Sequence, residues 1–118
     1  ELRRAAARPG VTLALHTWSH PNLARLDAAE TREELVRCRE WLTRHVGPPR
    51  PWLAYPYGLR AAHTEEAARS VGVERAFLVT GGWTPPGAEG AWTWPRLNVP
   101  SGLSDRGFLL RAAGLGPG

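Results

Sequence analysis

Apolar and polar positions alternate along the chain in blocks that predict strands and helices in turn. Residues 11–15 form a short β-prone apolar run, Val-Thr-Leu-Ala-Leu, and a run of this length between turn residues is typical of a buried strand. Further strands are expected at residues 52–55, 75–80 and 96–99. Helices are expected at residues 1–8, 28–45, 65–71 and 106–113.

The longest of these helices has the clearest pattern. Asp27 and Glu30 have the spacing of a capping box, in which each side chain accepts a hydrogen bond from the other residue's backbone. Gly47, followed by two prolines, ends the helix. One apolar stripe at helical spacing predicts its buried face, formed by Leu35, Cys38, Leu42 and either Val46 or Trp41.

This order of elements predicts an α/β fold. Strands that alternate with helices favour a parallel sheet or barrel with the connections on its outside. At 118 residues the chain has the size of one domain. In such folds the chemistry gathers at the carboxyl ends of the strands, and the two most unusual motifs of this chain follow predicted strands.

The first motif is His16-Thr17-Trp18-Ser19-His20, directly after the strand at residues 11–15. Two histidines four residues apart can converge from either a helix or an extended backbone, and imidazole nitrogen is a good zinc ligand. The zinc-protease helix motif is excluded, because it needs Glu where Thr17 stands. Taken alone, the pair is equally compatible with a chance spacing in a capped loop.

Two further motifs follow later strands. Residues 54–58, Ala-Tyr-Pro-Tyr-Gly, predict a tight turn that could aim backbone N–H groups at a developing oxyanion. The alternative is an ordinary strand-to-helix turn with aromatic packing. In residues 94–99, Trp-Pro-Arg-Leu-Asn-Val, Arg96 could orient a carboxylate or could simply be a solvated surface residue.

Composition narrows the classes of function. The net charge of +4 comes from arginines alone, and they are interleaved with acids rather than clustered, so nucleic-acid binding is not expected. A single cysteine, Cys38, excludes an internal disulfide and a thiolate zinc cluster. We find no stretch of about 20 apolar residues that would span a membrane, and no signal peptide.

With these motifs in order, the sequence resembles the polysaccharide deacetylases of carbohydrate esterase family 4, the NodB homology domain. The family pattern His-[Ser/Thr]-x-x-His is matched by His16, Thr17 and His20, and the Pro-[Tyr/Phe]-Gly turn by residues 56–58. The Ala-Tyr-Pro-Tyr-Gly form of the turn, followed by Pro-Arg-Leu-Asn-Val at residues 95–99, is similar to the poly-N-acetylglucosamine deacetylase branch.

The resemblance implies a distorted (β/α) barrel with parallel strands and metal-assisted hydrolysis of N-acetyl or O-acetyl groups. His16 and His20 would bind a divalent metal, with zinc the first choice, and the Tyr57 backbone N–H would hold the oxyanion. Tyr55 and Trp94 are candidates for contact with an acetylated polysaccharide. Trp83, Trp92 and Trp94 could line a sugar-binding groove or could equally pack in the core or in a loop. The resemblance also implies that the whole protein works at the cell envelope or outside the cell.

Departures from the family pattern lead us to expect an incomplete site. The Thr-[Phe/Tyr]-Asp-Asp motif, which supplies the catalytic base and a third metal ligand, belongs on an earlier strand and is missing from these 118 residues. Ala54 replaces an Arg of the family, and Arg96 would take over the role of holding the catalytic Asp. We therefore expect residues 1–118 to be one partial domain, without its N-terminal strands and poorly active. The alternative is an inactive remnant that binds glycan through its aromatic loop.

The other two histidines are expected to have structural or solvent-facing positions. His45 lies at the end of the long helix, where it would interact favourably with the helix dipole. His63 precedes Thr64 in a connection and is expected to be exposed. The sequence does not indicate the oligomeric state.

Overall fold

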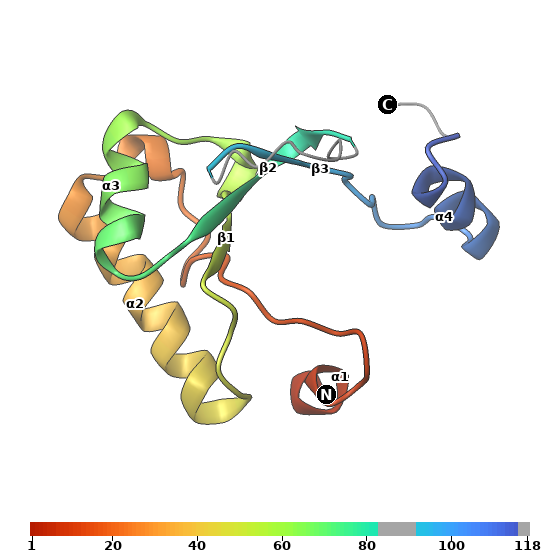
Figure 1. The fold of residues 1–118 in the computed structure, drawn as a ribbon, viewed down its shortest axis with the longest axis horizontal. Coiled ribbons are helices and arrows are strands. Elements are labelled where there is room, and N and C mark those ends of the chain that lie inside the picture. Colours follow the sequence, from red (N-terminus) through yellow and green to blue (C-terminus); the bar gives the residue numbers. More distant parts are fainter. Residues whose placement is uncertain (83–91, 116–118) are drawn as a thin grey trace.

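The computed structural model describes residues 1–82 and 92–115 as an α/β fold. Three short parallel strands form the sheet, and helices lie around it (Figure 1). The strands are β1 (Trp52–Ala54), β2 (Arg75–Gly81) and β3 (Trp94–Arg96). The helices are α1 (Leu2–Ala6), α2 (Ala28–His45), α3 (Ala62–Ser70), α4 (Asp105–Ala112) and two 3₁₀ turns, η1 (Leu23–Arg25) and η2 (Pro56–Gly58).

The sheet has the strand order β1-β2-β3, and both pairs are parallel, as the alternating sequence pattern predicted. The expected strand at residues 11–15 lies beside β1 but forms only one bridge, between Leu15 and Leu53. The Leu15 N–H donates to the Trp52 carbonyl at 2.8 Å, and the Ala54 N–H donates to the Leu15 carbonyl at 3.0 Å. This segment therefore places His16 at the carboxyl edge of the sheet, next to the end of β1.

The last strand differs from the prediction, which placed it at residues 96–99. Strand β3 begins at Trp94 and includes Pro95, and its pairing with β2 shifts register between Phe77 and Gly81. The Trp94 ring lies edge to face with the Phe77 ring, at 5.9 Å between centroids. A proline without an N–H is tolerated here because β3 ends the strand order and pairs on one side only.

One face of the sheet packs against α2 and α3, which lie together on the left in Figure 1. Alternate strand residues point to opposite faces, and Leu53 and Tyr55 are both fully buried on the helix side. They join a core that also contains Leu15, Leu23, Leu35, Ala68 and Ala76. Burying such side chains stabilises the fold by about 1.5–3 kcal/mol for each large apolar group.

Helix α2 has the capping box that the sequence predicted. The Asp27 carboxylate accepts from the Glu30 N–H, and the Glu30 carboxylate accepts from the Asp27 N–H, both at 2.8 Å. Its buried stripe is completed by Val46, which packs partly buried against the core, whereas Trp41 is exposed.

The two ends of the chain are less enclosed: α1 and α4 stand apart from the sheet in Figure 1, and α4 buries none of its residues. Among the described helices, none is long and apolar enough to cross a bilayer.

Candidate functional site

Two segments that the sequence singled out meet at the carboxyl edge of the sheet. Residues 16–20 follow the bridge at Leu15, and η2 follows β1 directly. The rings of His16 and His20 lie edge to face, with 4.8 Å between centroids. The ring of His20 in turn lies edge to face with that of Tyr57, at 4.7 Å. All three side chains are exposed to solvent, so the structure brings both histidines to an open position beside the turn.

The hydrogen bond of His16 determines which ring nitrogen is free. Its Nδ1 atom lies 2.8 Å from the carbonyl oxygen of Ala54. A carbonyl can only accept, so Nδ1 must carry the proton and donate it. In the neutral ring, Nε2 then has the lone pair. Histidines that bind metals commonly have such a backbone partner, which fixes the tautomer and the ring orientation.

This bond gives a first testable prediction. The neutral side chain of His16 should be the Nδ1–H tautomer, and it should lose this preference when the ring is released from the Ala54 carbonyl. Long-range ¹H–¹⁵N NMR correlations distinguish the two tautomers directly, and the exposed ring of His45 serves as the internal reference. An Nε2–H tautomer at His16 would contradict the assignment of Nε2 as the free nitrogen.

The backbone between the two histidines has an uncommon conformation. Thr17 has φ 67° and His20 has φ 60°, in the left-handed region that costs a residue with a side chain about 1–2 kcal/mol. The Thr17 hydroxyl, in a side chain only 7% exposed, accepts from the His20 N–H at 3.1 Å. This bond closes the loop over three residues and brings the second histidine back toward the first.

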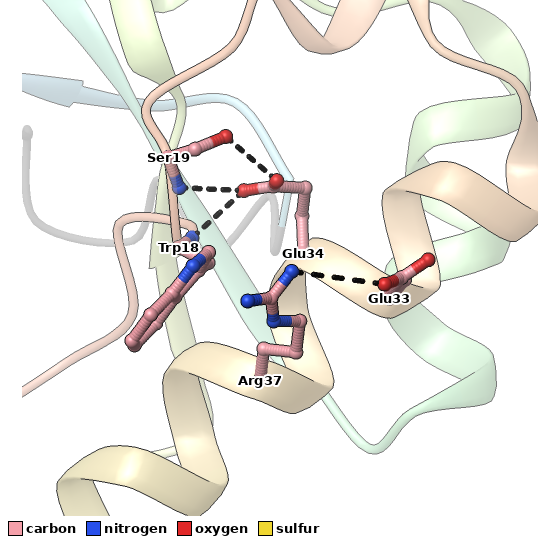
Figure 2. A network of polar contacts seen from close by, with 5 residues as sticks. All are labelled: Trp18, Ser19, Glu33, Glu34 and Arg37. Carbon is pink, nitrogen blue, oxygen red and sulfur yellow. Dashed lines mark hydrogen bonds and ion pairs between the residues drawn. The ribbon is translucent and has the colours of Figure 1, made fainter.

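A carboxylate from α2 holds the same loop from outside. Glu34 Oε2 accepts from the N–H groups of Trp18 at 2.9 Å and Ser19 at 2.8 Å, and Oε1 accepts from the Ser19 hydroxyl at 2.7 Å (Figure 2). Burial raises the pKa of Glu34, but the hydrogen bonds from Ser19 and Trp18, with the charge of Arg37, outweigh it and hold the pKa below its usual value. The carboxylate is therefore charged at neutral pH.

The turn at η2 is shaped by two residues with positive φ. Tyr57 has φ 58° and its side chain is 59% exposed, and Gly58 has φ 69°. The bonds that close the turn are donated by the N–H groups of Gly58 and Leu59, to the carbonyls of Tyr55 and Pro56. The Tyr57 N–H takes no part in these two bonds. A Cβ atom on Gly58 would lie 2.7 Å from Val79 Cγ1.

We expect Gly58→Ala to destabilise the fold by about 2–5 kcal/mol. The left-handed φ costs about 1–2 kcal/mol for a non-glycine residue, and forcing a methyl group into packed atoms adds about 1–3 kcal/mol. Urea unfolding measures the loss. Gly10→Ala is the matched control, because Gly10 has φ 81° and no atom within 4 Å of the added Cβ, so only the first cost applies. Equal losses in the two variants would show that contact with Val79 is unimportant.

Two other predicted site residues, Arg96 and Trp94, are half-buried. Arg96 is half-buried, and its Nε donates to the Leu78 carbonyl at 3.0 Å. It lines an apolar hollow of about 520 Å³ together with Ala14, Ala54 and Phe77. Because Ala54 also accepts the His16 bond, this hollow borders the histidine loop. Trp94 is half-buried and packs between Phe77 and the guanidinium of Arg75, which lies 5.1 Å from its ring centre.

Tyr55 does not have the position of a substrate contact. Its ring is fully buried in the core, and its hydroxyl donates to the Trp92 carbonyl at 3.2 Å. Trp92 is itself only 6% exposed, which argues against a place in a sugar-binding groove, and Trp83 lies outside the described residues. Tyr55 and Trp92 therefore pack the interior beneath the turn.

The remaining histidines are both in contact with other groups. His45 is exposed at the end of α2, where its ring lies 5.1 Å from that of Trp41 and its carbonyl accepts a bond from Arg3 Nε. His63 is half-buried rather than exposed as expected, because its Nε2 lies 2.6 Å from the Leu26 carbonyl. That contact joins the start of α3 to the segment that follows the histidine loop.

The donor set fits part of a metal site. Two rings that each bind a common ion at ~2.0–2.1 Å with tetrahedral angles have centroids about 5 Å apart, and the observed separation is 4.8 Å. However, no cluster of three or more His, Cys, Asp and Glu residues suited to a metal occurs in residues 1–82 and 92–115. The described residues thus supply two imidazoles and no third ligand. A catalytic zinc site needs three protein ligands and an open position.

Comparisons with known proteins agree with this fold. The family model described as polysaccharide deacetylase matches residues 1–76. Over 52 residues, the chain is 36% identical to a peptidoglycan-N-acetylglucosamine deacetylase from Bacillus cereus. Among solved structures, it is similar to IcaB from Ammonifex degensii, with a TM-score of 0.71, 21% identity and 98% of this chain covered. It is also similar to the Streptococcus pyogenes deacetylase PplD in complex with acetate, with a TM-score of 0.67, 19% identity and 83% of this chain covered.

The matches cover only part of these relatives. The aligned region is 44% of this chain and 19% of the Bacillus cereus protein. The chain covers 52% of the IcaB structure and 43% of the PplD structure. At these low identities the structural likeness shows the fold, and it confirms that the parallel α/β unit corresponds to part of a deacetylase fold.

Proposed function

Because the chain belongs to the polysaccharide deacetylase family, we propose that residues 16–20 and the turn at η2 form part of a metal-dependent site that removes acetyl groups from a polysaccharide. The observation that carries the proposal is the line of rings from His16 through His20 to Tyr57, exposed at the carboxyl edge of the sheet. One solved neighbour is a deacetylase that holds acetate, which supports an acetyl group as the part of the substrate that reacts.

In this proposal His16 and His20 hold a divalent metal, with zinc the first candidate. His16 would bind through Nε2, since Nδ1 is engaged by the Ala54 carbonyl. A bound divalent metal supplies polarisation of a carbonyl and a lowered pKa of water. A third ligand would have to come from outside the described residues, so we propose that these two imidazoles alone bind the metal weakly.

The turn at η2 would stabilise the charge that develops on the acetyl oxygen. In hydrolysis, water oxygen bonds to the carbonyl carbon, the carbon–nitrogen bond breaks, and the nitrogen leaves as an amine after gaining a proton. The Tyr57 N–H is held in a strained turn that closes through the neighbouring N–H groups, so it is available as an oxyanion donor. Such a donor is worth about 10²–10³ in rate.

Arg96 would act by orienting a carboxylate. Its Nε is bound to the Leu78 carbonyl, which fixes the guanidinium plane at the hollow beside Ala54. We propose that it holds an acidic residue contributed from outside the described chain, and that Trp94 contributes to the sugar-facing rim. An acetylated glycan of the cell envelope or exterior is the proposed substrate, consistent with the peptidoglycan named for the Bacillus cereus relative.

Acetate release from N-acetylglucosamine oligomers tests the proposal. We expect slow release by the purified chain when zinc or cobalt is added, and loss of release on adding a chelator. Release that persists in chelator would contradict metal dependence. Glycan binding without acetate release at saturating metal would instead support the inactive remnant.

A further inference from the structure

We propose that Glu34 is a positioning residue for the metal-binding loop: its carboxylate holds Trp18 and Ser19 so that His16 and His20 converge. This inference rests on the proposed function, because it assigns Glu34 a purpose only if the two imidazoles share a ligand. Sequence reasoning gave Glu34 no role, since it is one of several acids on α2. The structure gives it three hydrogen bonds to a segment 15–16 residues earlier in the chain.

The hydrogen bonds of Glu34 fall on the two residues between Thr17 and His20. Both oxygens are used: Oε2 accepts two backbone N–H groups and Oε1 accepts the Ser19 hydroxyl. Within the described parts of the chain, side-chain ion pairs join Arg37 to Glu33 and Arg69 to Glu65, and neither includes Glu34. Figure 2 shows the separation, with Glu34 reaching up to the loop while Glu33 pairs with Arg37 on the helix surface.

The loop needs an outside anchor because its own backbone opposes the geometry. Thr17 and His20, on either side of the anchored pair, both have left-handed φ values, which side-chain-bearing residues keep only where their surroundings hold them. Inside the loop, only the Thr17 hydroxyl bonded to the His20 N–H closes the curve. The Glu34 bonds tie the middle of the loop to α2, a long helix that is fixed by its own buried stripe.

Arg37 gives α2 a second contact with Trp18, in addition to the bonds of Glu34. Its guanidinium carbon lies 5.0 Å from the centre of the Trp18 ring, and its NH1 lies 3.8 Å from Glu33 Oε1. Helix α2 therefore holds Trp18 by its backbone through Glu34 and by its ring through Arg37. Because Trp18 stands midway between the histidines in sequence, movement of this residue would change the separation of both rings.

The test compares Glu34→Ala and Glu34→Gln with Glu66→Gln, which removes one negative charge from an exposed position on α3. Zinc is the probe, and binding is followed by NMR of the His16 and His20 rings. We expect Glu34→Ala to weaken zinc binding about 10–100-fold, the usual cost of losing an outer partner of a metal ligand. The zinc affinity of Glu34→Gln, which keeps one acceptor oxygen, should fall between that of Glu34→Ala and the unchanged affinity of Glu66→Gln.

A metal-free readout separates this inference from the proposed function. In Glu34→Ala the amides of Trp18 and Ser19 should exchange with solvent faster, and the nuclear Overhauser contact between the two histidine rings should weaken, while the melting temperature changes little. If the unsubstituted chain binds no zinc, the proposed function fails. The amide-exchange data then still test whether Glu34 positions the loop. Unchanged amide exchange and unchanged ring contacts in Glu34→Ala would overturn the positioning role, as would equal zinc affinity in the Glu34→Ala and Glu66→Gln variants.

Discussion

Replacing either His16 or His20 with alanine is expected to lower zinc affinity by more than ~100-fold. In the proposed site each variant removes one of the two imidazoles that the described residues supply, and loss of a direct ligand should exceed the 10–100-fold cost of losing an outer hydrogen-bond partner. The 4.8 Å between the ring centroids is compatible with a shared ion. Any metal-dependent acetate release should disappear with the affinity. Isothermal titration with zinc measures the affinity, and an acetate assay measures the release.

His45→Ala is the matched control for these variants. His45 is also exposed, but it lies at the end of α2 against Trp41. Its loss should leave zinc affinity within about twofold of the original, an expected change of less than about 0.5 kcal/mol. An equal loss of affinity in His16→Ala and His45→Ala would mean that zinc binds non-specifically to surface imidazoles, and the site assignment would then fail.

Tyr55→Ala is expected to destabilise the fold by about 3–5 kcal/mol, the usual cost of removing a large buried ring. Tyr55 is fully buried below the turn, and its hydroxyl donates to the Trp92 carbonyl. Tyr55→Phe keeps the ring and loses that one hydrogen bond, which should cost only about 1 kcal/mol. Thermal or urea unfolding measures both. A large loss of glycan binding in a stable Tyr55→Phe variant would instead restore Tyr55 as a substrate contact.

Tyr55 should also make stability depend on alkaline pH. Burial raises its pKa from 10.0 to about 12, so between these values the unfolded chain loses a proton that the folded chain keeps. Its contribution, roughly 2–3 kcal/mol, is thus present below pH 10 and lost as pH rises toward 12. The chain has no lysine, so no ammonium side chain titrates in this window. Urea unfolding at pH 9 and pH 11.5 should show a smaller decline in Tyr55→Phe; an equal decline would contradict the assignment.

Much of the scaffold could be predicted because it depends on local pattern. Helix α2 follows from its capping pair and its apolar stripe, and both are present as expected. The meeting of the histidine motif with the turn at η2 follows from a rule of topology, since neighbouring parallel strands end at the same edge of a sheet. The family resemblance named the same two segments, and the match over residues 1–76 confirms the family.

Other features depend on contacts that no local pattern encodes. The Glu34 bonds join residues far apart in sequence, and they meet a loop with left-handed backbone at Thr17 and His20. Strand β3 begins at Trp94, whose ring packs against that of Phe77, and it includes Pro95 because a strand at the end of the order tolerates proline. The burial of Tyr55 did have a signal that we overlooked. It lies two residues after Leu53, and a period of two puts both on the same face of a strand.

Zinc titration of the ¹⁵N-labelled chain, observed at the imidazole nitrogens, tests the central claim most directly. We predict that Nε2 of His16 and one ring nitrogen of His20 shift together, with a single affinity and a stoichiometry of one zinc per chain, while the rings of His45 and His63 do not respond. If only one of the two rings responds, or if all four histidines respond alike, His16 and His20 do not form a shared metal site.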